Sequence, residues 1–279
     1  MKHQVSGEII SNQEVSPGTH LIWVDAPDIA GEGKPGQFVM VDCPSADGLV
    51  LRRPMTIFRF GRDLRADALP KTSFSMLFNV VGKGTTWLSG CRRGERLDVI
   101  GPLGNGFSPS PTSKRLLMVA GGIGVAGVAA LADRAAQKDK EVRLLLGLRG
   151  SANTYPKEVI PQIVEVHLST EDGSLGKKGF VTDLLAEHVP WSDEVFACGP
   201  NAMFHSMAGV WEKSRYGQPA QVLLEARMGC GLGLCYACAI PTKTGFLRVC
   251  TNGPRFNLQE VDWQLLKSML SRPGDGKWL

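Results

Sequence analysis

The spacing of four cysteines near the end of the chain constrains its fold more than any other feature. Cys230, Cys235, Cys238 and Cys250 are separated by four, two and eleven residues. Three close thiolates followed by a distant fourth are the plant-type arrangement for a [2Fe–2S] cluster, and interposed glycines let the loop aim backbone N–H groups at the sulfurs. The alternative is a structural zinc site, which usually shows two Cys-x2-Cys pairs. The spacing therefore predicts an iron–sulfur centre.

The use of cysteine and the first residues of the chain indicate the cellular compartment in which the protein is expected. Four of the seven cysteines lie within 21 positions, which in a cytosolic protein indicates metal binding rather than disulfides. Cys43 and Cys91 are expected to be small buried side chains. The first ten residues lack an apolar core, and the uncharged run 116–132 is shorter than a membrane span. We therefore expect a soluble, cytoplasmic protein with no membrane partner.

Length and charge limit the classes of function. The 279 residues fit two or three domains. The formal net charge is +4, and the chain has no Lys/Arg stripe with interleaved aromatic residues. We expect no nucleic-acid partner, because the binding of anionic cofactors accounts equally well for this mild excess.

The pattern of predicted secondary structure changes near a Pro/Ser-rich stretch at residues 108–113. Before it, short predicted strands separated by Gly and Pro turns favour an antiparallel β-barrel. These strands are residues 38–42, 74–81 and 96–100. After it, strands and helices alternate, which favours a parallel sheet covered by helices. The predicted strands are 116–120, 142–148, 163–169 and 194–197, and the predicted helices are 125–138, 181–187 and 202–213.

These two patterns of secondary structure predict an α+β multidomain fold. We expect a β-barrel domain over residues 1–108 and a Rossmann-like α/β domain over 109–219. A small C-terminal iron–sulfur domain is expected over 220–279.

Two turns at strand ends are candidates for nucleotide binding. Gly121-Gly122-Ile123-Gly124 follows a predicted strand and precedes a helix, whose N-terminus offers free N–H groups to a phosphate. Cys198-Gly199-Pro200 also ends a strand, and ligands of open α/β sheets bind at the carboxyl ends of strands. The alternatives are a tight crossover without a ligand and a core thiol in a sharp turn.

A third candidate lies in the predicted barrel. Arg52-Arg53-Pro54-Met55-Thr56 begins a strand, and an Arg beside a hydroxyl residue can bind a pyrophosphate. The alternative is an exposed basic turn.

The order of these motifs carries a family resemblance. Arg53-Pro-Met-Thr56 is followed by Gly82-Lys-Gly-Thr85, by the two strand-end turns and by the cysteine cluster. Together they resemble the electron-transfer subunit of type B dihydroorotate dehydrogenase, a branch of the ferredoxin–NADP reductase superfamily. The resemblance covers nearly the whole chain, and the cysteine cluster is its most specific part.

The resemblance implies three redox groups: FAD bound by the β-barrel domain 1–108, a nicotinamide nucleotide bound by the α/β domain 109–219, and a [2Fe–2S] cluster in the domain 220–279. The implied FAD-binding residues are Arg53, Pro54, Met55, Thr56, Leu77, Phe78, Asn79, Gly84 and Thr85. NAD(H) or NADP(H) is implied to bind at Gly121, Gly122, Gly124, Cys198, Gly199 and Pro200. The implied cluster ligands are Cys230, Cys235, Cys238 and Cys250. Three positions depart from the family pattern: Thr56 replaces a common Ser, Asn79 a common Lys or Arg, and Gly127 a common Pro.

The resemblance also implies a partner. Electrons would pass between the FMN of a catalytic subunit and NAD(P) through the cluster and FAD, in a heterotetramer with two copies of each chain. Dihydroorotate would be oxidised in that partner during pyrimidine biosynthesis, so no acid–base catalytic side chain is expected here. Tyr236, between two cluster ligands, is a candidate interface residue or a shield for the cluster.

Two other functions remain open. The chain could instead be the NAD(P)H-oxidising subunit of a ferredoxin reductase, sulfide dehydrogenase or hydrogenase complex. The second alternative belongs to a different functional class: a non-catalytic binding module that is stabilised by zinc and has no flavin. The cofactor choice is also open, because Arg149 stands where an acidic residue would favour NAD.

Overall fold

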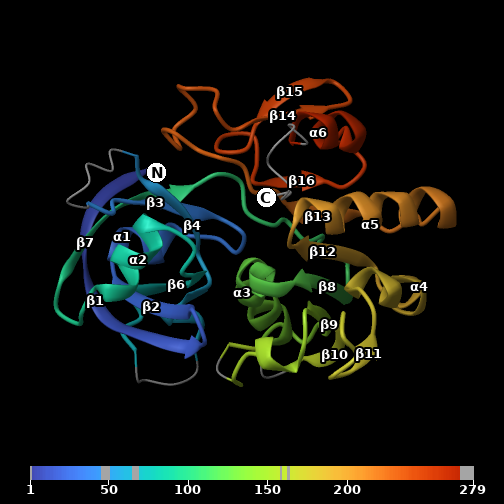
Figure 1. Ribbon diagram of the computed structural model, residues 1–279, viewed down its shortest axis with the longest axis horizontal. Helices are drawn as coiled ribbons and strands as arrows, with labels where there is room; N and C mark the ends of the chain where they lie inside the picture. Colours follow the sequence, from blue (N-terminus) through green and yellow to red (C-terminus); the bar gives the residue numbers. More distant parts are fainter. Residues whose placement is uncertain (1, 45–50, 65–68, 158, 162–163, 271–279) are drawn as a thin grey trace.

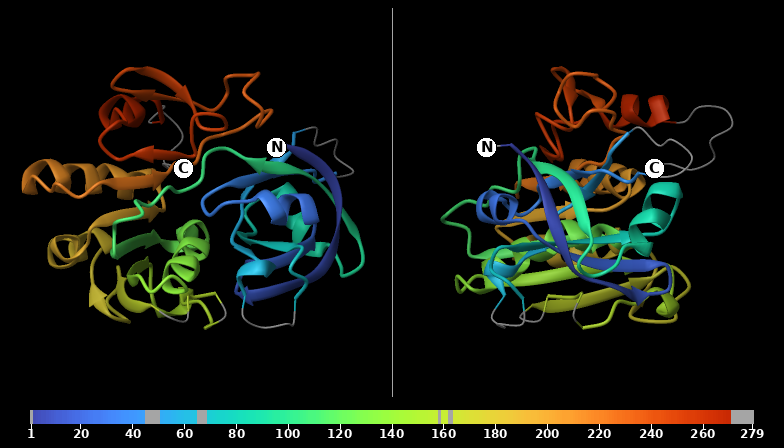
Figure 2. Two further views of the ribbon diagram at one scale, coloured as in Figure 1. Left: turned by 180° about the vertical axis from the view of Figure 1, so that it is seen from behind. Right: turned by 90° about the vertical axis from the view of Figure 1, so that its left-hand side faces the viewer.

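The chain folds into two lobes with a smaller C-terminal region above them. The computed structural model describes residues 2–44, 51–64, 69–157, 159–161 and 164–270. Figure 1 shows the N-terminal strands in one lobe and the alternating strands and helices in the other. The C-terminal region lies across the top of both lobes, and Figure 2 shows the same arrangement from behind and from the side.

The first lobe is a seven-stranded antiparallel half-barrel with the strand order β4-β3-β7-β1-β2-β6-β5. Its strands are β1 (His3–Ser16), β2 (Thr19–Asp25), β3 (Phe38–Val41), β4 (Arg53–Thr56), β5 (Arg59–Phe60), β6 (Ser73–Asn79) and β7 (Arg96–Leu103). Its helices are α1 (Pro27–Glu32) and α2 (Lys83–Gly90), and a 3-10 turn, η1, spans Gly61–Asp63. Register shifts between Ile9 and Ser11 and between Glu14 and Ser16 interrupt the β1–β2 ladder. Such bulges bend a strand, and the curled sheet brings β4 against β6.

The second lobe is an α/β sheet with the order β11-β10-β9-β8-β12-β13-β16. Its strands are β8 (Arg115–Gly121), β9 (Glu141–Leu148), β10 (Glu165–Thr170), β11 (Lys177–Lys178), β12 (Glu194–Cys198), β13 (Ala220–Leu223) and β16 (Arg255–Asn257). All neighbours are parallel except β13 and β16. The helices are α3 (Val125–Ala136), α4 (Leu185–His188) and α5 (Asn201–Ser214). Four 3-10 turns complete the lobe: η2 (Gly122–Gly124), η3 (Ser151–Asn153), η4 (Val181–Leu184) and η5 (Val189–Trp191).

Both faces of this sheet are buried, as expected for parallel strands between helices. Along β8, Leu116 and Met118 pack with α3, whereas Leu117 and Val119 pack with the elements that include α4 and α5. The two-residue period of the strand therefore sends alternate side chains into two separate cores.

The C-terminal region is joined to both lobes. It contains the hairpin β14 (Ala239–Thr242) and β15 (Gly245–Arg248) and the helix α6 (Trp263–Leu270). One buried cluster combines Met40 and Leu103 of the half-barrel with Val222 of the α/β sheet and Ile240 of the hairpin. The backbone N–H of Asn105 also donates to the Gly253 carbonyl at 2.6 Å. The cysteine loop is thus packed against the other two parts.

The predicted fold class is confirmed: an antiparallel half-barrel, a parallel α/β sheet and a small cysteine-containing region. The predicted strands and helices match observed elements with small differences at their ends. Residues 181–187 are a 3-10 turn followed by the short α4 rather than one helix, and Ile163 of the predicted strand 163–169 lies outside the described residues. No helix in the described ranges is long and apolar enough to cross a membrane.

Candidate cofactor sites

The four predicted cluster ligands come together as two pairs of thiols. The side chain of Cys230 interacts with that of Cys235, and the side chain of Cys238 interacts with that of Cys250. Cys238 and Cys250 are buried, whereas Cys235 is exposed. No group of three His, Cys, Asp or Glu side chains among the described residues is arranged for a single metal ion. Four thiolates shared by two irons give two per iron, so the observed pairs suit a two-iron cluster.

Backbone N–H groups point at these sulfurs. The Cys230 Sγ accepts the N–H groups of Leu232 and Leu234, both at 3.3 Å, and the Cys238 Sγ accepts the N–H of Cys250 at 3.5 Å. Partial burial raises the pKa of the Cys230 thiol, but backbone hydrogen bonds outweigh that effect and lower it to about 6. Burial and the Cys238 thiol raise the pKa of Cys250 to about 11. Cys230 is therefore prepared as an anionic ligand by the fold alone.

The glycines of the loop are required by this close wrapping. Gly231 and Gly233 have φ angles of +70° and +89°, which residues other than glycine rarely adopt. A Cβ on Gly231 would lie 2.4 Å from Met40 of the half-barrel, and a Cβ on Gly229 would lie 3.1 Å from the Cys235 Sγ. The loop thus fits a group held close to its backbone, as a cluster would be.

The predicted flavin-binding motifs meet at the open side of the half-barrel. A Cβ on Gly84 would lie 2.7 Å from the Nε of Arg53, so the Arg53 side chain lies directly over the first turn of α2. The Thr85 hydroxyl accepts the N–H groups of Val81 and Gly82 at 2.9 and 3.1 Å. A cation beside the N-terminus of an eight-residue helix is a suitable place for a diphosphate.

The other predicted flavin residues are placed around this point. Met55 is buried in the half-barrel core, whereas Pro54 is exposed and Thr56 partly so. Leu77 packs with the α/β lobe and Phe78 with the half-barrel, so their side chains are occupied by core packing. Among the described residues, β5 pairs with β6 only at Phe74 and Ser75. Asn79, at the end of β6, is partly exposed.

The predicted nicotinamide turns are in direct contact. A Cβ on Gly124 would lie 2.0 Å from the carbonyl oxygen of Cys198, and one on Gly121 would lie 2.9 Å from Pro200. Gly122 has a φ of +54°. The two turns end β8 and β12, which are neighbours in the sheet although β9 to β11 lie between them in the chain. This is the point where strand order reverses, and nucleotides bind there in open α/β sheets.

Family models match two parts of the chain. One is described as the iron–sulfur cluster binding domain of dihydroorotate dehydrogenase B and matches residues 225–262. The other is described as an oxidoreductase NAD-binding domain and matches residues 118–208. These ranges contain the four cysteines and both strand-end turns.

Similar whole proteins extend this match. The dihydroorotate dehydrogenase B (NAD(+)) electron transfer subunit of Desulforamulus reducens is 36% identical over 272 residues, covering 95% of this chain and all of that protein. The chain belongs to the family of dihydroorotate dehydrogenase B electron transfer subunits. The subunit of Listeria monocytogenes is 33% identical over 92% of this chain and 98% of its own.

A solved structure resembles the complete fold. It is described as an NADH-dependent reduced ferredoxin–NADP oxidoreductase in a study of flavin-based electron bifurcation. The TM-score is 0.79 at 29% identity, and the match covers 99% of this chain and 96% of that one. A ferredoxin reductase from carbazole 1,9a-dioxygenase matches 78% of this chain with a TM-score of 0.63 at 18% identity, which indicates a shared fold.

The structure accounts for two of the positions that depart from the family pattern, Asn79 and Gly127. Asn79 accepts a hydrogen bond from the Thr19 hydroxyl at 2.9 Å, so its side chain joins β6 to β2. A Cβ on Gly127 would lie 2.6 Å from the Cys198 Sγ and 2.9 Å from Leu223. Gly127 therefore lets α3 pack closely on the end of β12, and the observed contact explains why a small residue stands there.

Sequence reasoning missed Glu225 at the nucleotide edge of the sheet. Glu225 lies just beyond β13, and Leu223 of β13 is in register with Cys198. Glu225 is exposed to solvent, but the protein atoms around its carboxyl group desolvate it and raise its pKa. Burial, followed by the charge of Glu225, raises the pKa of Cys198. The missed signal is an acidic residue directly after a buried strand of the sheet.

Arg149 and a second carboxylate lie at the far end of the same edge. Arg149 is exposed and follows β9, and its carbonyl accepts the N–H of Asp172, which follows β10. The Asp172 carboxylate accepts the N–H and hydroxyl of Ser174, which lower its pKa. The edge thus offers a cation and a carboxylate together, so Arg149 alone does not decide between NAD and NADP.

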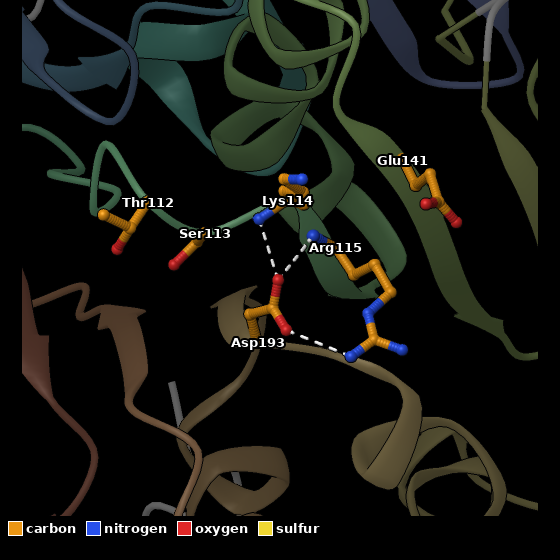
Figure 3. Close-up of a pocket in the computed structure, with 6 residues that line it drawn as sticks. All are labelled: Thr112, Ser113, Lys114, Arg115, Glu141 and Asp193. Atoms are coloured by element: carbon orange, nitrogen blue, oxygen red, sulfur yellow. Dashed lines mark hydrogen bonds and ion pairs between the residues drawn. The ribbon is translucent and has the colours of Figure 1, made fainter.

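The hollow drawn in Figure 3 is separate from these sites. It has a volume of about 500 Å³ and lies at the amino ends of β8 and β9, near Arg115 and Glu141. Asp193 faces into it and accepts the backbone N–H groups of Lys114 and Arg115 at 2.7 and 2.9 Å. These bonds tie the start of β8 to the segment before β12, and the hollow lies at the edge opposite to the nucleotide turns.

Proposed function

We propose that this chain passes electrons between the FMN of a dihydroorotate-oxidising subunit and NAD through a [2Fe–2S] cluster and FAD. The observation that carries the proposal is the presence of two thiol pairs in a glycine-rich loop packed against both nucleotide-binding lobes. When bound, FAD exchanges two electrons with a nicotinamide and single electrons with the cluster, which is why such a chain needs both groups.

The residues of the chain hold and orient these groups. Arg53 and the N-terminus of α2 would bind the FAD diphosphate, and the end of β6 at Leu77, Phe78 and Asn79 would border its ring system. The Gly124 and Cys198 turns would hold the nicotinamide end of NAD at the sheet edge that faces the half-barrel. Cys230 and Cys235 would bind one iron, and Cys238 and Cys250 the other.

The site residues are proposed in full as follows. FAD is assigned to Arg53, Pro54, Met55, Thr56, Leu77, Phe78, Asn79, Gly84 and Thr85, and NAD to Gly121, Gly122, Gly124, Cys198, Gly199 and Pro200. NAD rather than NADP is supported by the names of the relatives, which specify NAD(+).

The assembly is proposed on the same basis. The name of the relatives, electron transfer subunit, supports a catalytic partner that binds FMN, and we propose a cytoplasmic complex with two copies of each chain. The exposed side chains of Leu234 and Tyr236 beside the cluster ligands support a partner contact there. The proposed domain limits are 1–108, 109–219 and 220–279, although β13 and β16 of the last range pair within the α/β sheet.

The proposal is tested with the chain alone and with its partner. The isolated chain should oxidise NADH with an artificial electron acceptor but should not oxidise dihydroorotate. Adding the FMN-binding subunit should restore dihydroorotate oxidation coupled to NAD. Turnover of dihydroorotate by the isolated chain would contradict the proposal.

A second function is favoured by one observation. The structural match at 29% identity is to a chain described as part of a ferredoxin–NADP oxidoreductase. If the partner that co-purifies with the chain reduces ferredoxin rather than oxidising dihydroorotate, this second function replaces the first.

A further inference from the structure

Arg248 contacts the cysteine loop at two separate points. It is the last residue of β15 and is partly buried. Its Nη1 donates to the carbonyl of Gly233 at 2.5 Å, and its guanidinium carbon lies 4.6 Å from the centre of the Tyr236 ring. Gly233 and Tyr236 both lie between the ligands Cys230 and Cys238. A residue from a different strand thus holds the loop that carries three of the four ligands.

Both contacted residues have positive φ angles, which is unusual for Tyr236 but not for a glycine. Gly233 has a φ of +89° and Tyr236 a φ of +58°. Positive φ is uncommon for a residue with a side chain, and it persists where neighbouring contacts fix it. The Tyr236 ring is 65% exposed, so the guanidinium stacked on it is a specific contact rather than part of a core. Arg248 therefore supports the loop at Tyr236, where the backbone conformation is unfavourable for a residue with a side chain.

Arg248 also reaches the fourth ligand through the backbone. The N–H of Gly233, whose carbonyl Arg248 binds, donates to the Cys250 Sγ. The Arg248 carbonyl accepts the N–H groups of Thr251 and Asn252 at 3.2 and 2.8 Å, which shapes the turn after Cys250. In the described part of the chain, the guanidinium contacts a carbonyl and a ring rather than a carboxylate. No ion pair among the described residues therefore neutralises its positive charge.

We propose that Arg248 is a positioning residue for the iron–sulfur cluster. Its guanidinium holds the loop of Cys230, Cys235 and Cys238 against the turn of Cys250, and its charge favours the reduced form of the cluster. The proposal rests on the proposed function, because it requires a [2Fe–2S] cluster at these cysteines. Net charge near a cluster and hydrogen bonds around its sulfurs are two of the terms that set its reduction potential.

The test compares charge removal with charge retention. Arg248→Gln removes the charge, whereas Arg248→Lys keeps it but loses the planar group that contacts Gly233 and Tyr236 together. Lys243→Gln is the matched control, since Lys243 is an exposed cation of the same hairpin region. Two quantities are measured. The reduction potential of the cluster is obtained from a redox titration monitored by electron paramagnetic resonance, and the rate of cluster loss to a chelator is obtained from the decay of visible absorption.

We expect the two variants to separate the two roles. Arg248→Gln should lower the equilibrium constant for one-electron reduction about tenfold, which corresponds to about 59 mV. Arg248→Lys should leave the potential near that of the unmodified chain but lose its cluster several-fold faster. Lys243→Gln should match the unmodified chain in both measurements.

Each outcome decides one proposal. If the unmodified chain holds no two-iron cluster, the proposed function fails. If it holds the cluster and Arg248→Gln matches Lys243→Gln in both readouts, the role of Arg248 is wrong. If Arg248→Gln cannot retain a cluster, Arg248→Lys decides: faster bleaching supports the positioning role, and bleaching at the unmodified rate overturns it.

Discussion

An ion pair between the lobes provides a prediction whose size follows from the structure. Arg59 of β5 lies 2.6 Å from Asp133 of α3, and their side chains are 8% and 16% exposed. Removing one partner of a buried pair takes away its compensation of the other charge and costs about 3–5 kcal/mol. Since Asp133 is partly accessible, we expect Asp133→Ala to lower the free energy of unfolding by about 3 kcal/mol, the low end of that range.

The assay is thermal unfolding of the purified chain. At about 2 °C per kcal/mol for a chain of this size, Asp133→Ala should lower the midpoint by about 6 °C. Glu212→Ala, which removes an exposed carboxylate of α5, is the control and should shift it by less than about 1 °C. The double variant Arg59→Met with Asp133→Leu should recover most of the loss, because no buried charge remains unpaired. An equal shift for Asp133→Ala and the control would refute this reasoning.

Three further predictions concern the cofactor sites. Gly124→Ala places a Cβ 2.0 Å from a backbone oxygen, so it should cost about 1–3 kcal/mol of stability and weaken NADH binding, measured by calorimetry; unchanged affinity would contradict the site. Arg53→Ala should weaken FAD binding about 10- to 100-fold by losing charge-assisted bonds, measured by flavin release, whereas exposed Arg92→Ala should not. Burial raises the pKa of Cys43 and Cys91 to about 11, so both thiols should resist alkylation at pH 8 and react only as the pH approaches 11; rapid labelling at pH 8 would contradict their burial.

The α/β lobe could be predicted closely because its central strands β8, β12 and β13 are buried. Continuous apolar runs such as the one that forms β8 identify such strands, and glycines mark where they end. The predicted helix 125–138 matches α3 to within two residues for the same reason: alanines and apolar residues continue to a charged end. Contact between the turns at Gly124 and Cys198 also followed from the rule for carboxyl ends of parallel strands.

The first strand of the half-barrel was harder to predict than the buried strands β3 and β6, because few of its side chains are buried. β1 spans fourteen residues, but its polar positions and two register shifts hide its period. The contact of Arg53 with Gly84 depends on how the sheet curls, which no local pattern records. Arg248 and Tyr236 meet through the fold of the hairpin, so the sequence pointed to the four cysteines but not to the arginine that contacts their loop.

The central claim is that this chain carries one FAD and one two-iron cluster at the four paired cysteines. The most direct test is anaerobic visible absorption of the purified chain together with iron, sulfide, zinc and flavin analysis. The account predicts two irons, two sulfides and one FAD per chain, with the irons lost in a Cys238→Ser variant. Bound zinc without flavin or sulfide would contradict it.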